Sequence, residues 1–204
     1  MMRRIVVVGA SAGGVEALIA LAKGLPPDLG VPIAVVLHVS PAVPSYLPAI
    51  LARSGPLDSR HARDGETPEP GRIYVAPPDM HMLVETDALR VVRAARENGH
   101  RPAIDPLFRS AAQAYGSGVI AVVLSGTRND GAAGVQEVAA RGGAVVVQDP
   151  ADAIHGSMPA HAIIADNPDD VVPAAQLAAA VSFHLAEPLT ELAQRRPWGE
   201  RSGR

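Results

Sequence analysis

The sequence lacks cysteine altogether, and none of its hydrophobic runs is long. Without cysteine the chain forms neither disulfides nor thiolate metal sites, which fits a reducing, cytoplasmic location. No apolar run approaches the roughly 20 residues that cross a bilayer, so we expect no membrane insertion. The start, residues 1–8, resembles a secretory signal only briefly, because its apolar run is short and ends at Gly9.

The charge balance excludes a further class of partner. The 204 residues include 18 basic and 21 acidic side chains, a net charge of −3, and form no basic stripe of the kind that binds nucleic acid. With 48% apolar residues the chain is long enough for one domain with a sizeable core. It has no internal repeat and no linker. We therefore expect a single domain over 1–186 and a charged, loosely ordered tail over 187–204.

The order of apolar patterns predicts an α/β fold. Buried strands are expected at 5–8, 31–37, 72–76, 118–124 and 144–147, and helices at 15–22, 46–51, 107–115, 135–140, 160–165 and 171–185. Two short runs, 80–84 and 89–92, predict an antiparallel hairpin. The segments 58–70, 94–101 and 148–159 are interpreted as polar loops. Strands that alternate with helices imply a doubly wound, mainly parallel sheet with helices on both faces.

The first strand runs into Gly9-Ala10-Ser11-Ala12-Gly13-Gly14, a glycine turn before a helix. A dinucleotide-binding turn requires glycine where this chain has Ser11, so that interpretation is disfavoured. The letters fit Gly-x-Ser-x-Gly, in which small neighbours expose a serine hydroxyl above a parallel sheet. A plain strand-to-helix connection remains the alternative.

Two more side chains follow buried strands and belong to the same edge of the predicted sheet. His38 ends the second strand, and Asp130 lies in the glycine-rich loop after the strand at 118–124. A serine needs an imidazole to take its proton, and the imidazole needs a carboxylate to orient it. We therefore predict a Ser11–His38–Asp130 triad. A structural role for His38, and a turn or cap role for Asp130, remain the alternatives.

Other polar side chains compete for these roles. The candidates are Asp105 and Asp149 among carboxylates, Ser40 and Ser125 among hydroxyls, and His81, His100 and His155 among imidazoles. The spacing of the histidines matches no metal-ligand motif, so we expect neither a metal nor a cofactor.

Seven stretches resemble the catalytic domain of the CheB chemotaxis methylesterases. They cover residues 5–173 in the family's order: Val8–Leu18, Leu37–Pro41, Asp64-Gly65-Glu66, Tyr74–Pro78 with His81-Met82, His100–Asp105 with Leu107-Phe108, Leu124–Gly131, and Gln148–Pro150 through Met158-Pro159. A set of motifs in order is far more specific than any one of them.

The resemblance implies a function and partners. It implies that Ser11, His38 and Asp130 hydrolyse glutamate γ-methyl esters, and also deamidate glutamines, on the cytoplasmic helices of methylated chemoreceptors. Oxyanion donors are then expected at the backbone N–H groups of Ala12, Gly13 and Thr127. Two residues, Arg101 and Met158, are expected in loops that line the receptor cleft.

The chain departs from the family's pattern at three positions and in its length. Ala12 replaces a frequent threonine, and Thr127 and Arg128 replace methionine and glycine. The receiver domain that usually precedes this module lies outside the sequence, so we expect a stand-alone enzyme or an excised domain, with a separate phosphorelay or regulatory protein as partner. A catalytically silent receptor-binding module and a hydrolase of unrelated small esters remain the alternatives.

Overall fold

The computed structural model describes residues 4–41 and 43–188. Strands and helices alternate along the chain: β1 (Ile5–Ala10), α1 (Gly14–Gly24), β2 (Ile33–Leu37), α2 (Leu47–Ser54), β3 (Asp58–His61), β4 (Arg72–Val75), β5 (His81–Val84), β6 (Leu89–Val92), α3 (Ile104–Tyr115), β7 (Val119–Val123), α4 (Ala132–Ala140), β8 (Ala144–Gln148), α5 (Ser157–Ala165), β9 (Asp170–Val172) and α6 (Leu177–Ala186). Short 3-10 helices, Gly116–Gly118 and Ala174–Gln176, precede β7 and α6.

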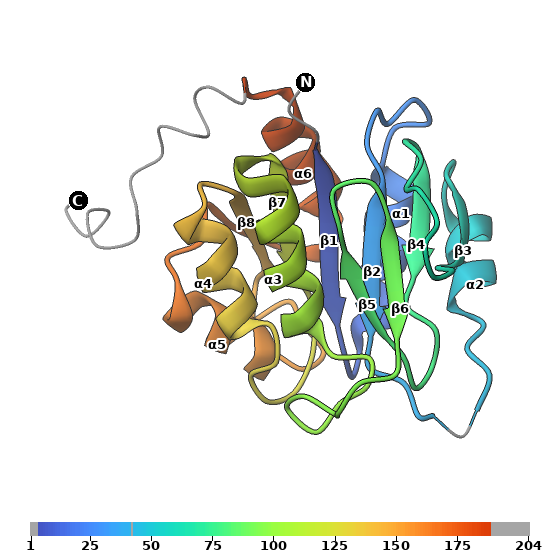
Figure 1. The fold of residues 1–204 in the computed structure, drawn as a ribbon. Coiled ribbons are helices and arrows are strands. Elements are labelled where there is room, and N and C mark those ends of the chain that lie inside the picture. The colour runs from blue at the N-terminus through green and yellow to red at the C-terminus, as the bar shows by residue number, and fades with distance from the viewer. Residues whose placement is uncertain (1–3, 42, 189–204) are drawn as a thin grey trace.

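A seven-stranded parallel sheet forms the centre, in the order β3-β4-β2-β1-β7-β8-β9 (Figure 1). The antiparallel hairpin β5–β6 lies apart from it. This confirms the predicted doubly wound sheet with its hairpin. After β1 the chain adds strands on one side, and from β7 on it adds them on the other. The strand order therefore reverses between β1 and β7, the place where such sheets bind ligands.

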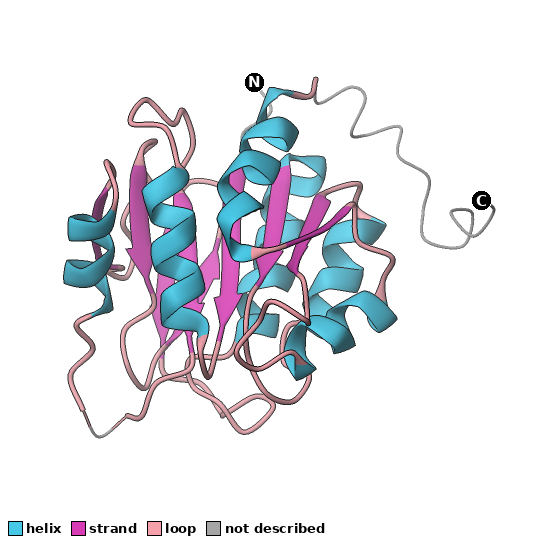
Figure 2. Ribbon diagram, turned by 180° about the vertical axis from the view of Figure 1, so that it is seen from behind, coloured by secondary structure: helices cyan, strands magenta, loops and turns pink. Residues whose placement is uncertain are grey.

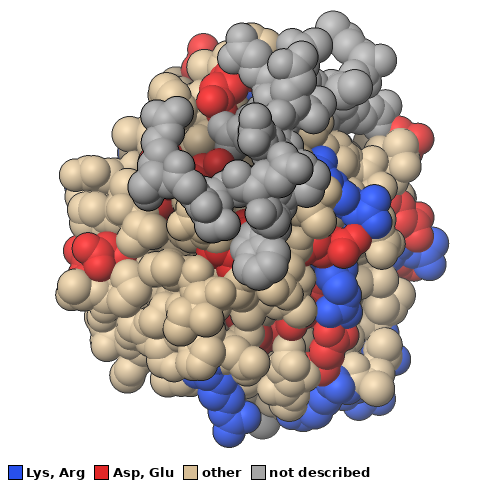
Figure 3. Space-filling view, turned by 90° about the vertical axis from the view of Figure 1, so that its left-hand side faces the viewer, with Lys and Arg blue, Asp and Glu red and all other residues tan. Residues whose placement is uncertain are grey.

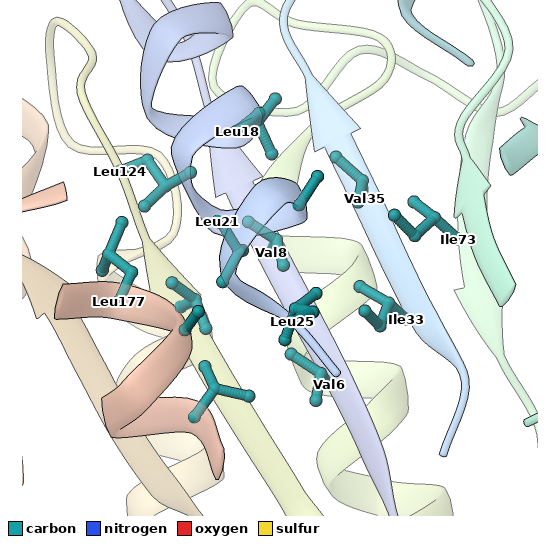
Figure 4. Close-up of a cluster of buried hydrophobic side chains, with 14 of the residues drawn as sticks. Val6, Val8, Leu18, Leu21, Leu25, Ile33, Val35, Ile73, Leu124 and Leu177 are labelled. Carbon is teal, nitrogen blue, oxygen red and sulfur yellow. The ribbon is translucent and has the colours of Figure 1, made fainter. Parts of the chain in front are cut away.

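Helices cover both faces because the central strands are apolar on both. Every residue of β1, β2, β7 and β8 is buried. On one face α1, α2 and α6 pack against the sheet (Figure 2), with Leu18, Leu21 and Leu177 against Val8 and Leu124 (Figure 4). On the other face lie α3, α4, α5 and the hairpin.

The two edge strands differ from the prediction. β3 lies within the segment expected to be a polar loop, and β9 overlaps the start of the expected helix 171–185. Both pair along one side only, with β4 and β8. An edge strand is held by backbone hydrogen bonds rather than by a buried apolar run, so its sequence carries little of the signal. Most of the predicted tail, residues 189–204, lies outside the described residues.

Candidate active site

Three adjacent strands position the predicted side chains at one edge of the sheet. Ser11 follows β1, His38 follows β2, and Asp130 lies between β7 and α4. Backbone hydrogen bonds continue past the strand ends: Ser11 N–H donates to Ser125 O (3.0 Å), and His38 N–H donates to Ala10 O (3.0 Å). The parallel ladder thus fixes the spacing of the serine and the histidine before their side chains meet.

The three side chains form a continuous chain of hydrogen bonds. His38 Nδ1 lies 3.0 Å from Ser11 Oγ, and His38 Nε2 lies 2.7 Å from Asp130 Oδ2. An ionised carboxylate only accepts, so Nε2 carries the ring proton and Nδ1 accepts from the serine hydroxyl. The ring is turned end for end relative to the serine-protease arrangement, in which Nε2 faces the serine. Either orientation leaves a free ring nitrogen to take the hydroxyl proton.

Asp130 is nearly inaccessible, at 2% exposure, and each of its oxygens accepts two hydrogen bonds. Oδ2 accepts from His38 and from the Ile104 N–H (2.8 Å), while Oδ1 accepts from Asn98 Nδ2 (2.8 Å) and the Asp105 N–H (3.1 Å). Burial alone raises the pKa of this carboxyl, but hydrogen bonds to its charged form outweigh burial and lower the pKa to about 2. Asp130 is therefore ionised at neutral pH.

Asp130 and Asp105 cap each other's helices. Asp130 binds the first two N–H groups of α3, and Asp105, in the first turn of α3, accepts from Gly131 N–H (3.0 Å) and Gly134 N–H (2.7 Å) at the start of α4. Each carboxylate lies at the positive end of the other's helix. Burial raises the pKa of Asp105, with a further contribution from the nearby Asp130 charge. Asp105 thus holds the Asp130 loop in place.

The predicted oxyanion donors, the N–H groups of Ala12, Gly13 and Thr127, come from the loops after β1 and β7. Among residues 4–41 and 43–188, nothing accepts a hydrogen bond from the N–H of Ala12, Gly13 or Thr127. Gly13 has a positive φ of 69° and is the N-cap of α1, so its N–H lies at the positive end of that helix. The three N–H groups have no partner among the described residues, and their role as oxyanion donors stays a prediction.

The two residues predicted to line the receptor cleft, Met158 and Arg101, pack against or bond to other parts of this chain. Met158 lies in the first turn of α5 rather than in a loop, and it is 1% exposed. Its N–H donates to Gly126 O (2.9 Å), and its thioether packs against the Gly126 backbone beside Ser11. Arg101 is engaged by Asp79 through Nε (2.9 Å) and Nη2 (2.6 Å). These two side chains buttress the loops around the site.

Several side chains that competed with the triad residues in the sequence make hydrogen bonds to backbone groups instead. Ser125 Oγ donates to Ala12 O (2.8 Å) and accepts from His155 N–H (2.9 Å), which joins the loops after β1, β7 and β8. Both ring nitrogens of His81 bond backbone groups. Asp149 accepts from a backbone N–H two residues on. These contacts explain polar residues that the sequence alone left as alternatives.

The structure adds two residues to the site from the segment interpreted as a charged loop. Asn98 bridges the two aspartates, and the ring of His100 stacks on that of His38 with centroids 3.6 Å apart and planes 4° apart. Asn98 was missed, and His100 was one of several unplaced histidines. The dipeptide Asn98-Gly99 is a strong signal for a tight turn and would have brought the two residues together.

Basic side chains lie around the site. Figure 3 shows Lys and Arg along the lower rim of the molecule, the edge that carries the loops after the strands. Arg96 and Arg128 are exposed and lie near enough to His100 for their charges to lower its pKa, after the larger effect of burial, and Arg128 has a positive φ of 65°, in the region that favours glycine. A pocket of about 460 Å³ lies away from the triad, at the opposite edge of the sheet, and is lined by Arg4, Val31 and Tyr115 among others.

The described residues contain no group of three or more His, Asp or Glu side chains placed to hold a metal ion. Within 4–41 and 43–188, no helix has both the length and the apolar character needed to cross a bilayer.

A doubly wound sheet with a bonded serine, histidine and aspartate at its carboxyl edge has the arrangement that serine hydrolases use. Comparison with known proteins narrows the class. The family model described as CheB methylesterase matches residues 6–181. A crystal structure of the Thermotoga maritima CheB methylesterase catalytic domain superposes with a TM-score of 0.85 at 32% identity, covering 89% of this chain and 98% of that one. The chain belongs to the CheB methylesterase family.

Curated relatives carry the same enzymatic name. A protein-glutamate methylesterase/protein-glutamine glutaminase from Nocardioides is 40% identical over 95% of this chain and 52% of its own length. One from Anaeromyxobacter dehalogenans is 42% identical over 83% of this chain and 50% of its own length. The chain thus spans about half the length of these relatives. A shorter relative from Leptospira interrogans is 36% identical, and 87% of it is covered.

Proposed function

We propose that this chain is a protein-glutamate methylesterase. It would hydrolyse γ-methyl esters of glutamate on the cytoplasmic helices of methylated chemoreceptors, act in the cytoplasm, and deamidate glutamine by the same chemistry. One observation carries the proposal: His38 bridges Ser11 Oγ and Asp130 Oδ2 at 3.0 and 2.7 Å, which is the geometry of an activated nucleophile. Family membership and the names of the relatives supply the substrate class.

The reaction follows from the assigned protons. His38 Nδ1 takes the Ser11 proton as Oγ attacks the ester carbonyl, and Asp130 stabilises the imidazolium that forms. The carbonyl oxygen becomes an oxyanion, which the N–H groups of Ala12 or Gly13 and Thr127 bind. Removal of one such donor typically costs on the order of 10²–10³ in rate.

Two steps complete the reaction: the tetrahedral intermediate breaks down to an acyl-enzyme, and water then hydrolyses the acyl-enzyme. His38 returns its proton to the methoxide oxygen, so methanol leaves and the acyl group remains on Ser11. Water gives a proton to His38 and adds to the acyl carbon, after which Ser11 Oγ leaves with that proton and the γ-carboxyl group of the receptor glutamate is released from the enzyme. With glutamine as substrate, ammonia leaves in place of methanol.

The test is methanol release from a methylated receptor fragment by the wild type and by Ser11→Ala. We expect the variant to lose methanol release while its thermal melting stays unchanged, because the side chain is small and makes one hydrogen bond. Ser117→Ala, at the opposite edge before β7, is the matched control and should keep full activity. Equal turnover by Ser11→Ala would remove Ser11 from the mechanism.

The alternatives give different patterns with a fluorophosphonate probe, which phosphorylates an activated serine. A wild type that reacts with the probe but releases no methanol hydrolyses other esters. A wild type that does neither is a silent receptor-binding module. Binding of the receptor fragment, measured separately, identifies that last case.

A further inference from the structure

A tight turn next to the triad contributes no member to it. Residues Glu97–His100 form a two-residue turn in which Asn98 (φ 53°) and Gly99 (φ 82°) both have positive φ. Glu97 N–H donates to His100 O (3.1 Å), and His100 N–H donates to Glu97 O (2.8 Å). Asparagine and glycine are the residues that adopt this backbone at least cost. The turn is therefore a defined element rather than a loose loop.

Both polar side chains of this turn touch the triad. Asn98 Nδ2 donates one hydrogen to Asp130 Oδ1 (2.8 Å) and the other to Asp105 Oδ2 (2.7 Å). The ring of His100 covers one face of the His38 ring, with centroids 3.6 Å apart and planes within 4° of parallel. The turn thus contacts the carboxylate through a hydrogen bond and the imidazole through a ring stack.

The turn is itself anchored to the helix that binds Asp130. Glu97 forms two hydrogen bonds with Arg109 of α3, at 2.6 and 2.9 Å. A two-point guanidinium–carboxylate pair fixes direction as well as distance. Asp130 and the turn are both hydrogen-bonded to α3, Asp130 at its first residues and Glu97 at Arg109. The helix therefore fixes the position of the turn relative to Asp130.

The charges that face His100 come from several elements. They are His38, after β2, Asp130, after β7, Arg128, in the same loop as Asp130, and Arg96, before the turn. Burial is the largest cause that lowers the pKa of His100. The positively charged neighbours lower this pKa further, whereas the charge of Asp130 raises it. A neutral ring here offers a flat, uncharged surface to His38, including when His38 has taken the serine proton.

We infer that the turn Glu97–His100 is a positioning element for ester hydrolysis: Asn98 fixes the Asp130 carboxylate, and His100 fixes the ring plane of His38. The inference rests on the proposed function. Neither residue touches the reacting atoms, since both act through a triad member. The expected signature is a loss of turnover without a loss of substrate binding.

His100 is tested with His100→Ala, His100→Phe and His100→Gln. We expect the rate of fluorophosphonate labelling and kcat for methanol release to fall about tenfold in the Ala and Gln variants, with KM unchanged. Phe restores both rates to within about twofold, because it supplies a flat ring for the stack. If His100 only stabilised the fold, the labelling rates of the variants would follow their melting temperatures, and an aromatic ring would not specifically restore them.

Asn98 is tested with Asn98→Gly, which removes the amide but keeps the positive φ without strain. We expect labelling and kcat to fall about tenfold or more, because Asp130 loses a hydrogen bond from a fixed donor. The matched control is His161→Ala, an exposed histidine on α5 whose hydrogen bonds within residues 4–41 and 43–188 are all to Ser157 and which should react at the wild-type rate.

Three results would overturn the inference: wild-type rates in Asn98→Gly and His100→Ala, equal rates for the Phe and Gln variants, or losses confined to KM. Labelling does not require a receptor ester, so the two proposals fail differently. A wild type that labels but releases no methanol removes only the ester assignment, and the labelling rates still decide the role of the turn. A wild type that does neither removes the reaction and the positioning role with it.

Discussion

Asp130→Asn places an amide where every neighbour is a donor. The carboxylate accepts from His38 and the Ile104 N–H on one oxygen, and from Asn98 and the Asp105 N–H on the other. An asparagine has one acceptor oxygen and one NH₂ group. Whichever way the amide turns, two of the four donors face another donor.

The structure gives the size of two effects. A buried donor left unpaired costs about 1–3 kcal/mol, and Asn98 lies in an exposed turn where water can replace part of the loss, so we expect about 3 kcal/mol lower stability. If the NH₂ faces His38, the ring takes the wrong tautomer and cannot accept the Ser11 proton. If the oxygen faces it, the imidazolium loses its counter-charge. In serine proteases the corresponding change costs about 10⁴ in kcat, and we expect a fall of at least about 10³.

Two assays check this prediction. Methanol release measures turnover, and urea denaturation measures the free energy of unfolding. Asp28→Asn, an exposed position before β2, is the control and should match the wild type in both. An Asp130→Asn variant with turnover within about twofold of the wild type would refute the assigned tautomer. Unchanged stability would refute the mutual capping of α3 and α4.

Three further changes have expected outcomes. The pKa of Asp130 is about 2, against 3.8 ordinarily, and this lowering contributes about 2 kcal/mol to the free energy of unfolding. The contribution is fully present above about pH 4 and is lost as pH falls toward 2, and urea midpoints across that range measure it. The raised pKa of the neighbouring Asp105 has the opposite effect and reduces the observed change. Gly126→Ala puts a methyl group 2.7 Å from Met158 Cε, so probe labelling should fall about tenfold or more, whereas Gly30→Ala, with nothing within 4 Å, should label normally. Arg128→Gly relieves a φ of 65° and should raise stability by about 0.5–1 kcal/mol in thermal melting; a lower melting temperature would contradict the strain argument.

The central strands were predictable because burial on both faces requires a continuous apolar run, and such a run is visible in the sequence. Ile5–Val8 and Val119–Val123 are short apolar runs rich in β-branched residues, which is typical of a strand buried on both faces. The edge strand Asp58–His61 was not, because its polar residues resemble a loop and only pairing with β4 makes it a strand. Val171-Val172 was assigned to the helix that follows, because a strand of three residues is too short to show a pattern and only pairing with β8 makes it a strand.

The candidate site was predictable in part. The edge rule of parallel sheets was enough to group Ser11, His38 and Asp130 from their places after strands. It could not rank Asp105, because a carboxylate that caps a helix from a neighbouring element has no local signature. Asn98 was lost for a similar reason, since its two hydrogen bonds reach residues 7 and 32 positions away.

The sequence by itself determined which central strands are buried, that the sheet is parallel and doubly wound, and hence which loops share an edge, because these follow from local apolar runs and from the alternation of strands with helices. Only the tertiary structure decided which nitrogen of His38 faces Ser11, and that Asp130 is held by α3 and by the turn at 97–100. Those outcomes depend on donors and acceptors brought together from distant segments, and no local pattern encodes such a meeting.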